Sequence, residues 1–323
     1  MRKVPPHSAG LSAALGFLVM LLLGGCASQP LQHRSLDAES QGLAPHTEMS
    51  QVPFHPQEAY HCGPAALAML MNWHGEPVAP DDLAPRVYLE GRQGSLQAEI
   101  LATARQHGLL AYVHDSGFER LLQQLDAGHP VVVLKNLGFD RYPIWHYAVV
   151  IGYDLDARQM ILRSGTTERK TLSFRRFERR WQGGDYWAMT LHRPGEFPAD
   201  AAERPYLRAA ADLEQVGRLS EAMDAYQAAT HRWPDGVLSW MALGNGHYRQ
   251  EHYLAAEAAY RAALAQEPHH AAAHHNLAWA LIRQQRPDDA LPHALRAHRL
   301  ASDQGAHYRG ALQALLEQTS PRP

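Results

Sequence analysis

The chain has little cysteine and no excess of basic charge, and both absences limit what the protein can be. Its 323 residues include only two cysteines, Cys26 and Cys62, in unlike sequence surroundings, so we expect no disulfide between them. The formal net charge is -3, whereas a nucleic-acid-binding protein usually presents a basic face, so no nucleic-acid partner is expected. The 21 histidines are scattered without metal-ligand spacing, and neither a metal nor another cofactor is expected.

A hydrophobic run of membrane-spanning length is also missing from the first residues. Arg2 and Lys3 precede an apolar run over 11–23, which is shorter than the roughly 20 residues that a spanning helix needs. The run ends in Leu-Gly-Gly-Cys at 23–26, which resembles the bacterial lipobox. This pattern indicates an export signal over residues 1–26 rather than a transmembrane helix.

The lipobox resemblance implies that Cys26 is lipidated and becomes the N-terminus, which leaves it unavailable for chemistry. The alternative is an ordinary signal peptide with an incidental cysteine. Ala27 and Ser28 follow without an Asp, which by resemblance to Gram-negative lipoproteins favours the outer membrane over the inner one. We therefore expect a lipid anchor in the outer membrane with the protein facing the periplasm. The polar residues 27–50 are predicted to be a flexible tether.

Residues 51–193 show helical patterning first and strand patterning afterwards. Helices are predicted over 63–74, 95–108 and 118–127, and strands over 131–134, 147–153, 160–163 and 187–191. Helices followed by strands predict an α+β domain with a mostly antiparallel sheet. The Pro-containing segment 194–205 marks its boundary.

Beyond this boundary the sequence is rich in Ala and repeats every 34 residues. Small residues and prolines recur at this spacing: Ala222, Ala256 and Ala290, and Pro234 and Pro268. Small residues let two antiparallel helices approach closely, and Pro ends the second helix of a unit. An unrelated Ala-rich bundle would not show the period. We predict an all-α solenoid of three tetratricopeptide repeats over 203–304, with a capping helix and tail over 305–323, that recruits a protein partner.

Cys62 stands at the predicted start of an apolar helix. Gly63 and Pro64 follow it, and a Pro in the first helical turn costs no backbone hydrogen bond. The positive end of the helix dipole lowers the pKa of a nearby thiol, so we expect a thiolate nucleophile at neutral pH. The Cys62 N–H and the upstream Gln57 side chain are the candidate donors of an oxyanion hole.

His146 opens a predicted strand whose following residues are apolar. An imidazole at the edge of a buried sheet can accept the thiol proton as a general base. A lone cysteine in an apolar helix is usually inert packing, but Gln57, Cys62 and His146 occur in this order within one domain, which favours catalysis. His61 is a rival base that we interpret as part of the loop. The histidines without such context are interpreted as surface or structural: His74, His107, His114 and His129.

The segments around Cys62 and His146 resemble the papain-like bacteriocin leader peptidases, which cleave after a double glycine. The resemblance covers about residues 52–191. It implies a papain-like cysteine peptidase domain in which Cys62 is the nucleophile, His146 the general base and acid, and Gln57 the oxyanion-hole glutamine. Together with the export signal and the repeats, the chain resembles a small group of proteobacterial cysteine-peptidase-like lipoproteins.

One position departs from that family. The family usually has an Asp or Asn on the strand after the histidine strand, which holds the imidazole in the right tautomer. Here Ser164 occupies that place, and a hairpin turning near Asp156 would bring it back toward His146. Glu168 and Asp154 are the acidic alternatives. The sequence therefore predicts a Cys/His dyad with Ser164 as the third site residue.

These observations predict a cell-envelope cysteine peptidase that hydrolyses a peptide bond of a peptide or protein substrate, with the repeats recruiting substrate or partner. A hypothesis from another class is a catalytically degenerate peptide-binding or assembly lipoprotein. A third is an acyltransferase that passes the thioester acyl group to an amine or a hydroxyl.

Overall fold

The computed structural model describes residues 31–36, 42–56, 61–89, 91, 94–115, 117–301 and 308–319. The predicted export signal, the lipidation site Cys26 and the predicted oxyanion donor Gln57 lie outside these residues. Within them, no helix is both long enough and apolar enough to cross a membrane.

A seven-stranded antiparallel sheet organises the first part of the chain, which we call the sheet domain. From edge to edge its strands are β4 (Leu110–Val113), β9 (Ala188–His192), β5 (Val131–Asn136), β6 (Trp145–Asp154), β7 (Gln159–Ser164) and β8 (Thr167–Ser173), and β1 (His46–Glu48) pairs with β6. All residues of β5 are buried, which explains its apolar run over 131–134, and Lys135 and Asn136 at its end are buried polar residues.

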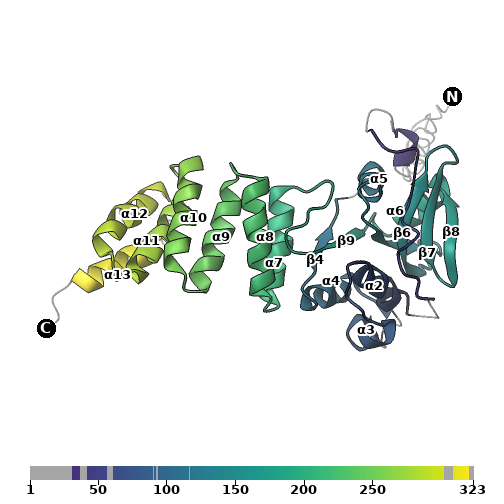
Figure 1. Cartoon of the computed structure of the whole chain (residues 1–323), viewed down its shortest axis with the longest axis horizontal. Helices are drawn as coiled ribbons and strands as arrows, with labels where there is room; N and C mark the ends of the chain where they lie inside the picture. Colours follow the sequence, from purple (N-terminus) through teal and green to yellow (C-terminus); the bar gives the residue numbers. More distant parts are fainter. Residues whose placement is uncertain are drawn as a thin grey trace, which may run out of the picture.

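Helices cover the sheet, and the most deeply buried of them is α2 (Cys62–Trp73). Every residue of α2 from Gly63 to Met71 is buried, and the helix packs against β6. The other helices are α3 (Pro80–Val87), α4 (Gln97–Gln106), α5 (Phe118–Asp126) and α6 (Phe174–Gln182), beside a short ribbon of β2 (Tyr88–Leu89) and β3 (Gly94–Ser95) (Figure 1). The predicted α+β class is confirmed. The sequence analysis missed α3, α6, β1, β2, β3, β4 and β8.

The described part of the predicted tether, residues 27–50, belongs to the sheet domain. β1 pairs with β6 from His46 opposite Asp154 to Glu48 opposite Gly152. In the short 3-10 helix η1 (Gln32–Arg34), the buried His33 lies with its Nδ1 atom 2.6 Å from Oε2 of Glu178. The structure therefore differs from a flexible tether here. The reason is that these polar residues bind remote partners, which a local sequence pattern does not reveal.

The second part of the chain, which we call the repeat domain, consists of helix pairs. Its helices are α7 (Glu203–Gln215), α8 (Leu219–Arg232), α9 (Val237–Arg249), α10 (Tyr253–Gln266), α11 (Ala271–Arg283), α12 (Pro287–Leu300) and α13 (Arg309–Thr319). Ala222, Ala256 and Ala290, which define the repeat period, are all 0% exposed. A Cβ atom on Gly244 would lie 2.5 Å from the Tyr260 ring, so the small residues are required by close helix packing. The predicted all-α solenoid is confirmed.

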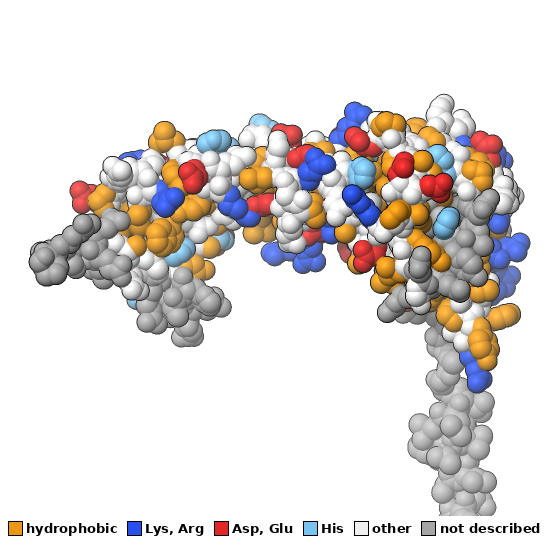
Figure 2. Space-filling model, turned by 90° about the horizontal axis from the view of Figure 1, so that it is seen from below, with side chains coloured by type: hydrophobic (Ala, Val, Ile, Leu, Met, Phe, Trp, Pro, Cys, Tyr) orange, Lys and Arg blue, Asp and Glu red, His pale blue; other side chains and the backbone are white. Residues whose placement is uncertain are grey.

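The repeat domain packs directly on the edge of the sheet. Leu110 and Tyr112 of β4 are buried in one cluster with Tyr206 and Leu213 of α7. The guanidinium of Arg218 also donates to the backbone oxygen of Gln106 at 2.9 Å. The first helix pair therefore covers an edge strand that would otherwise be open to pairing. The two domains follow one another along a long molecule whose displayed face mixes charges of both signs (Figures 1 and 2).

Candidate active site

Cys62 is the first residue of α2, and the N-terminus of that helix is fixed to the β2–β3 ribbon. A Cβ atom on Gly63 would lie 2.2 Å from Oγ of Ser95, so only glycine lets the helix approach this closely. The hydroxyl of Tyr147, on β6, donates to the backbone oxygen of Ser95 at 3.2 Å. These contacts hold the partly buried Cys62 against the first residues of β6.

The protonation state of Cys62 differs from the sequence prediction. Burial raises the pKa of the Cys62 thiol, although hydrogen bonds from the backbone N–H groups of Tyr147, Gly63 and Cys62 itself oppose that effect. Desolvation disfavours the charged thiolate more than the helix N-terminus favours it. The predicted resting thiolate is therefore wrong, and Cys62 rests as a thiol at neutral pH.

His146 is the second residue of β6 and lies next to Tyr147. Its Nε2 atom is 3.0 Å from Oγ of Ser164, at the end of β7. The β6–β7 hairpin creates this contact, because Val149 pairs with Arg163 and Ser164 follows directly. The structure thus brings together the predicted base and the predicted third residue.

The charge environment of His146 keeps its ring neutral. Burial, together with the positive charges of Lys135, Lys170 and Arg180, lowers the pKa of His146 to about 3. No carboxylate contacts the ring in the described residues. The resting pair is therefore a thiol and a neutral imidazole, not a thiolate and an imidazolium.

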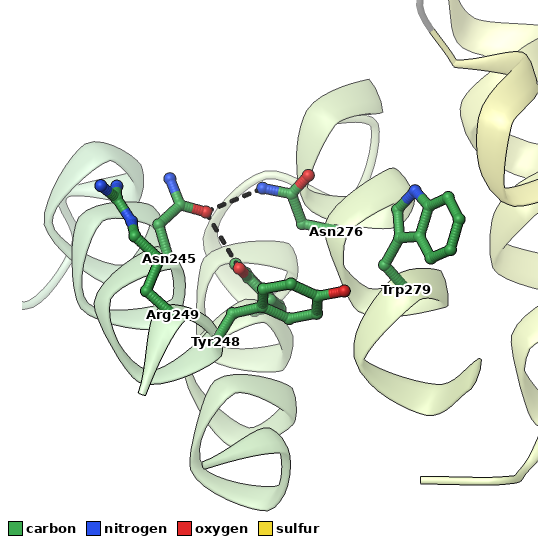
Figure 3. A pocket seen from close by; sticks show the side chains of 6 residues that line it. Asn245, Tyr248, Arg249, Asn276 and Trp279 are labelled. Carbon is green, nitrogen blue, oxygen red and sulfur yellow. Dashed lines mark hydrogen bonds between the residues drawn. The ribbon is translucent and has the colours of Figure 1, made fainter. Parts of the chain in front are cut away.

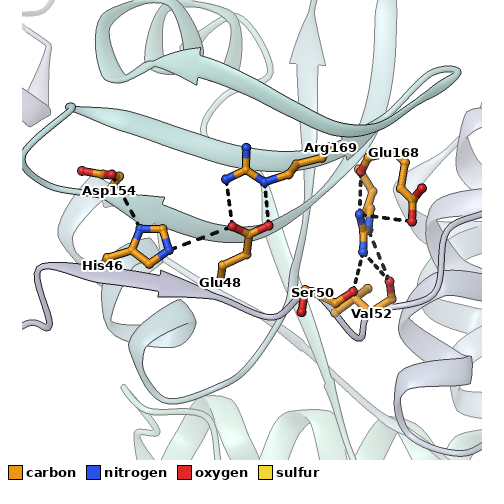
Figure 4. Close-up of polar contacts among 8 residues, drawn as sticks. His46, Glu48, Ser50, Val52, Asp154, Glu168 and Arg169 are labelled. Carbon is orange, nitrogen blue, oxygen red and sulfur yellow. Dashed lines mark hydrogen bonds and ion pairs between the residues drawn. The ribbon is translucent and has the colours of Figure 1, made fainter.

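The two acidic alternatives to Ser164 are engaged elsewhere (Figure 4). Oδ2 of Asp154 lies 3.6 Å from Nδ1 of His46, at the far end of β6. Oε1 of Glu168 lies 3.7 Å from Nη1 of Arg163, whose guanidinium also donates to backbone oxygens of the N-terminal segment. Neither acid orients His146.

Lys135 is a site residue that the sequence analysis missed. It is the cross-strand partner of His146 on β5, and its Nζ atom lies 3.5 Å from Oγ of Ser164. The residue is 1% exposed, and burial, together with the charges of Lys170 and Arg180, lowers its pKa to about 7. A lysine that directly follows the apolar predicted strand 131–134 was the signal that could have identified it, because the observed strand continues through it to Asn136.

An apolar hairpin joins β5 to β6 directly before His146. Its exposed large apolar side chains are Leu137 (38%), Phe139 (81%), Tyr142 (71%), Ile144 (60%) and Trp145 (52%), and the charged Asp140 and Arg141 at the turn are exposed as well. Phe139 and Tyr142 close the turn through their backbones, and Oδ1 of Asn136 accepts the N–H groups of Gly138 and Ile144. The hairpin is therefore an ordered apolar surface beside the base.

A pocket lined by polar and aromatic side chains lies in the repeat domain. Oδ1 of Asn245 accepts hydrogen bonds from Nδ2 of Asn276 at 2.8 Å and from the hydroxyl of Tyr260 at 2.9 Å. Tyr248, Arg249 and Trp279 complete its lining (Figure 3). The described residues contain no group of three or more His, Cys, Asp or Glu side chains placed to hold a metal ion.

Comparison with known proteins identifies both domains. Residues 49–188 match the Peptidase_C39 like family, and residues 241–306 match a tetratricopeptide repeat family. No curated protein matches the chain. The chain therefore carries a C39-like peptidase domain followed by tetratricopeptide repeats, as the sequence resemblance implied.

Solved structures are similar to the sheet domain and to the repeat domain. A putative C39-like peptidase from Bacillus anthracis is 20% identical with a TM-score of 0.38, over 46% of this chain and 97% of its own. The peptidase domain of Streptococcus ComA, a bifunctional ABC transporter, is 23% identical with a TM-score of 0.37, over 44% and 98%. The tetratricopeptide protein YrrB, with an unusual peptide-binding site, is 24% identical with a TM-score of 0.30, over 36% and 65%.

Proposed function

We propose that this protein is a cell-envelope cysteine peptidase that hydrolyses a peptide bond through Cys62 and His146. The observation that carries the proposal is the junction of α2 with β6. There the backbone N–H of Tyr147 reaches the Cys62 sulfur, while the adjacent His146 is held by Ser164. A nucleophile, a base and a residue that orients the base are the parts that thiol acyl transfer needs.

In the proposed reaction the proton moves as the sulfur attacks. Because Ser164 engages Nε2 of His146, Nδ1 is the ring nitrogen that takes the thiol proton. The sulfur forms a bond to the scissile carbonyl carbon, and the Cys62 N–H and the Gln57 amide stabilise the oxyanion. The imidazolium protonates the departing amine, and the C–N bond breaks. Water, activated by His146, then hydrolyses the thioester.

The experiment is labelling and turnover with the full-length protein. A peptide acyloxymethyl ketone should modify the wild type and not Cys62→Ala, and His146→Ala should lower the rate of cleavage of a peptide library at least 100-fold. His61→Ala is the matched control, because His61 directly precedes Cys62 but makes an edge-to-face contact with the ring of Tyr88. Labelling of Cys62→Ala, or loss of turnover in His61→Ala alone, would contradict the assignment.

One observation favours the second candidate, a catalytically inactive peptide-binding lipoprotein. Among the residues that the structure describes, a buried lysine and no acid lies behind Ser164, the residue that orients His146. In that case the wild type would bind peptides without ever being labelled. An acyltransferase would instead be labelled and would transfer the acyl group to an added amine faster than to water.

The envelope location and the anchor rest on the sequence of residues 1–28. Cys26→Ser should abolish incorporation of an alkyne-palmitate label and release the protein from the membrane fraction. Cys62→Ala is the control, because it removes the other cysteine and should leave the label in place. A label that survives in Cys26→Ser would exclude Cys26 as the anchor.

The repeat pocket supports the recruitment role. The carboxamides of Asn245 and Asn276 and the guanidinium of Arg249 can bind the backbone and a carboxylate of an extended peptide. Arg249→Ala should weaken binding of a substrate or partner peptide about tenfold while peptide-electrophile labelling of Cys62 stays unchanged. Equal affinity of the wild type and Arg249→Ala for the peptide would show that the peptide does not bind in this pocket.

A further inference from the structure

Lys135 is a buried lysine on β5 that is only 1% exposed. In the part of the chain that the structure describes, no carboxylate pairs with it, and its side chain bonds to Oγ of Ser164. A buried charge without a partner is costly, and an apolar side chain of similar volume would cost less. Fold stability therefore does not account for a lysine at this position.

The groups that face Lys135 come from every element packed around it. His146 on β6 and Ser164 on β7 lie on one side, and Cys62 on α2 attracts its charge. Lys170 on β8 and Arg180 on α6 repel it. The surroundings thus favour the neutral amine over the ammonium.

We propose that Lys135 is a positioning residue that selects, through the Ser164 hydroxyl, which ring nitrogen of His146 carries the proton. The inference rests on the proposed chemistry of Cys62 and His146. It adds a residue whose protonation state regulates that chemistry. The geometry is a chain of two hydrogen-bonding distances, 3.5 Å from Nζ to Oγ and 3.0 Å from Oγ to Nε2.

When Lys135 is neutral, both hydrogen bonds are donated in the direction of the lysine. The amine accepts the Ser164 O–H, and Oγ accepts the Nε2–H of His146. Nδ1 then keeps its lone pair and can take the thiol proton of Cys62.

When Lys135 is protonated, both hydrogen bonds are donated in the opposite direction, from the lysine toward His146. The ammonium donates to Oγ, the Ser164 O–H turns to Nε2, and the ring proton sits on Nδ1. In that tautomer Nδ1 is a donor and cannot act as the base. The ammonium also repels the imidazolium that forms during attack. Activity therefore requires neutral Lys135, and kcat/KM rises with pH as Lys135 loses its proton.

The test combines kinetics with a readout that needs no turnover. Imidazole 15N NMR, with His146 assigned by difference from His146→Asn, should show Nδ1–H at pH 5.5 and Nε2–H at pH 8.5 in the wild type. Lys135→Met should lose this pH dependence, and Lys135→Gln serves as a second variant that removes the titrating group. A tautomer that stays constant in the wild type, or a switch that persists in Lys135→Met, would overturn the proposal.

Kinetic measurements distinguish an effect of Lys135 that passes through the Ser164 hydroxyl from a direct electrostatic effect of its charge on His146. In Lys135→Met the acid limb of kcat/KM should move down by at least one pH unit. In the Ser164→Ala variant, adding Lys135→Met should not move the acid limb of kcat/KM any further, because the hydroxyl that connects Lys135 to His146 is already absent. Lys170→Met is the matched control: it removes a nearby charge that lowers the pKa of Lys135, so the acid limb should move up in this variant rather than down. An upward shift in Lys135→Met would show instead that the ammonium stabilises the Cys62 thiolate.

Failure of the peptidase proposal would look different. Absence of labelling and turnover leaves the tautomer titration measurable, and that titration alone then decides the role of Lys135. Normal turnover with a constant tautomer would reject the role of Lys135 while the peptidase stands.

Discussion

Oγ of Ser164 lies 3.0 Å from Nε2 of His146, so a hydroxyl holds the candidate catalytic imidazole at the position where the sequence resemblance leads one to expect an acid or an amide. A hydroxyl can donate to the ring or accept from it, whereas a carboxylate can only accept. This contact therefore fixes the position of His146 without fixing its tautomer, and it leaves the pKa of the ring low.

Replacing Ser164 by Asp should reverse the electrostatics of the site. A carboxylate between His146 and Lys135 favours the charged form of both, so their pKa values should rise from about 3 and about 7, respectively. NMR titration of the His146 ring measures the shift directly. Ser164→Asn is the control, since a neutral amide should leave the His146 pKa low; an equal rise in both variants would argue against a charge effect.

Lys135→Met should stabilise the fold by an amount that depends on pH. The unfolded chain holds the lysine proton up to about pH 10.5, whereas the folded chain releases it from about pH 7. In that window the unfolded state binds more protons, so wild-type stability rises with pH. A difference of one pKa unit corresponds to about 1.4 kcal/mol. The free energy of unfolding of Lys135→Met should therefore exceed that of the wild type by several kcal/mol at pH 7 and by little at pH 10.

Urea unfolding of both proteins at pH 6, 7, 8.5 and 10 measures this gain in the free energy of unfolding. The difference between the two proteins removes the titration of other groups. A gain that is the same at all four pH values would contradict the lowered pKa of Lys135.

Cys62 should react slowly with iodoacetamide at neutral pH. Burial raises its pKa, so the alkylation rate should keep rising through pH 9 without a plateau near neutrality. Mass spectrometry of the Cys62 peptide follows the reaction, with Cys62→Ala as the blank. Rapid alkylation at pH 5 would instead show a preformed thiolate and imidazolium.

The hairpin before His146 should contribute to substrate binding. Phe139 and Tyr142 are 81% and 71% exposed, so replacing both by Ser costs the fold little. Apolar area buried against a substrate contributes about 25 cal/mol per Å², so KM should rise roughly tenfold with kcat nearly unchanged. Leu254→Ser is the matched control, because Leu254 is 73% exposed on α10 in the repeat domain. Equal effects of the two changes would exclude a specific role.

Local patterns were sufficient to predict the elements that follow a strong period. Apolar runs identified β5, β6, β7 and β9, and the 34-residue spacing identified the repeats. Polar elements were missed, because β8 (Thr167–Ser173) alternates little and β1 is only three residues long. Their strands exist because a neighbouring strand supplies their hydrogen-bond partners, which is a tertiary effect.

The sequence by itself determined the candidate nucleophile and base, because Cys62 at a helix start and His146 at a strand start are chemical signatures carried by a few adjacent residues. It also determined the repeat architecture, because close helix packing demands small residues at a fixed period. Only the tertiary structure decided how the site is charged. Burial, not the helix dipole, sets the pKa of Cys62, and the pairing of β5 with β6 and of β6 with β7 places Lys135 behind Ser164. Both effects depend on residues distant in the sequence, and desolvation exists only once the chain has folded.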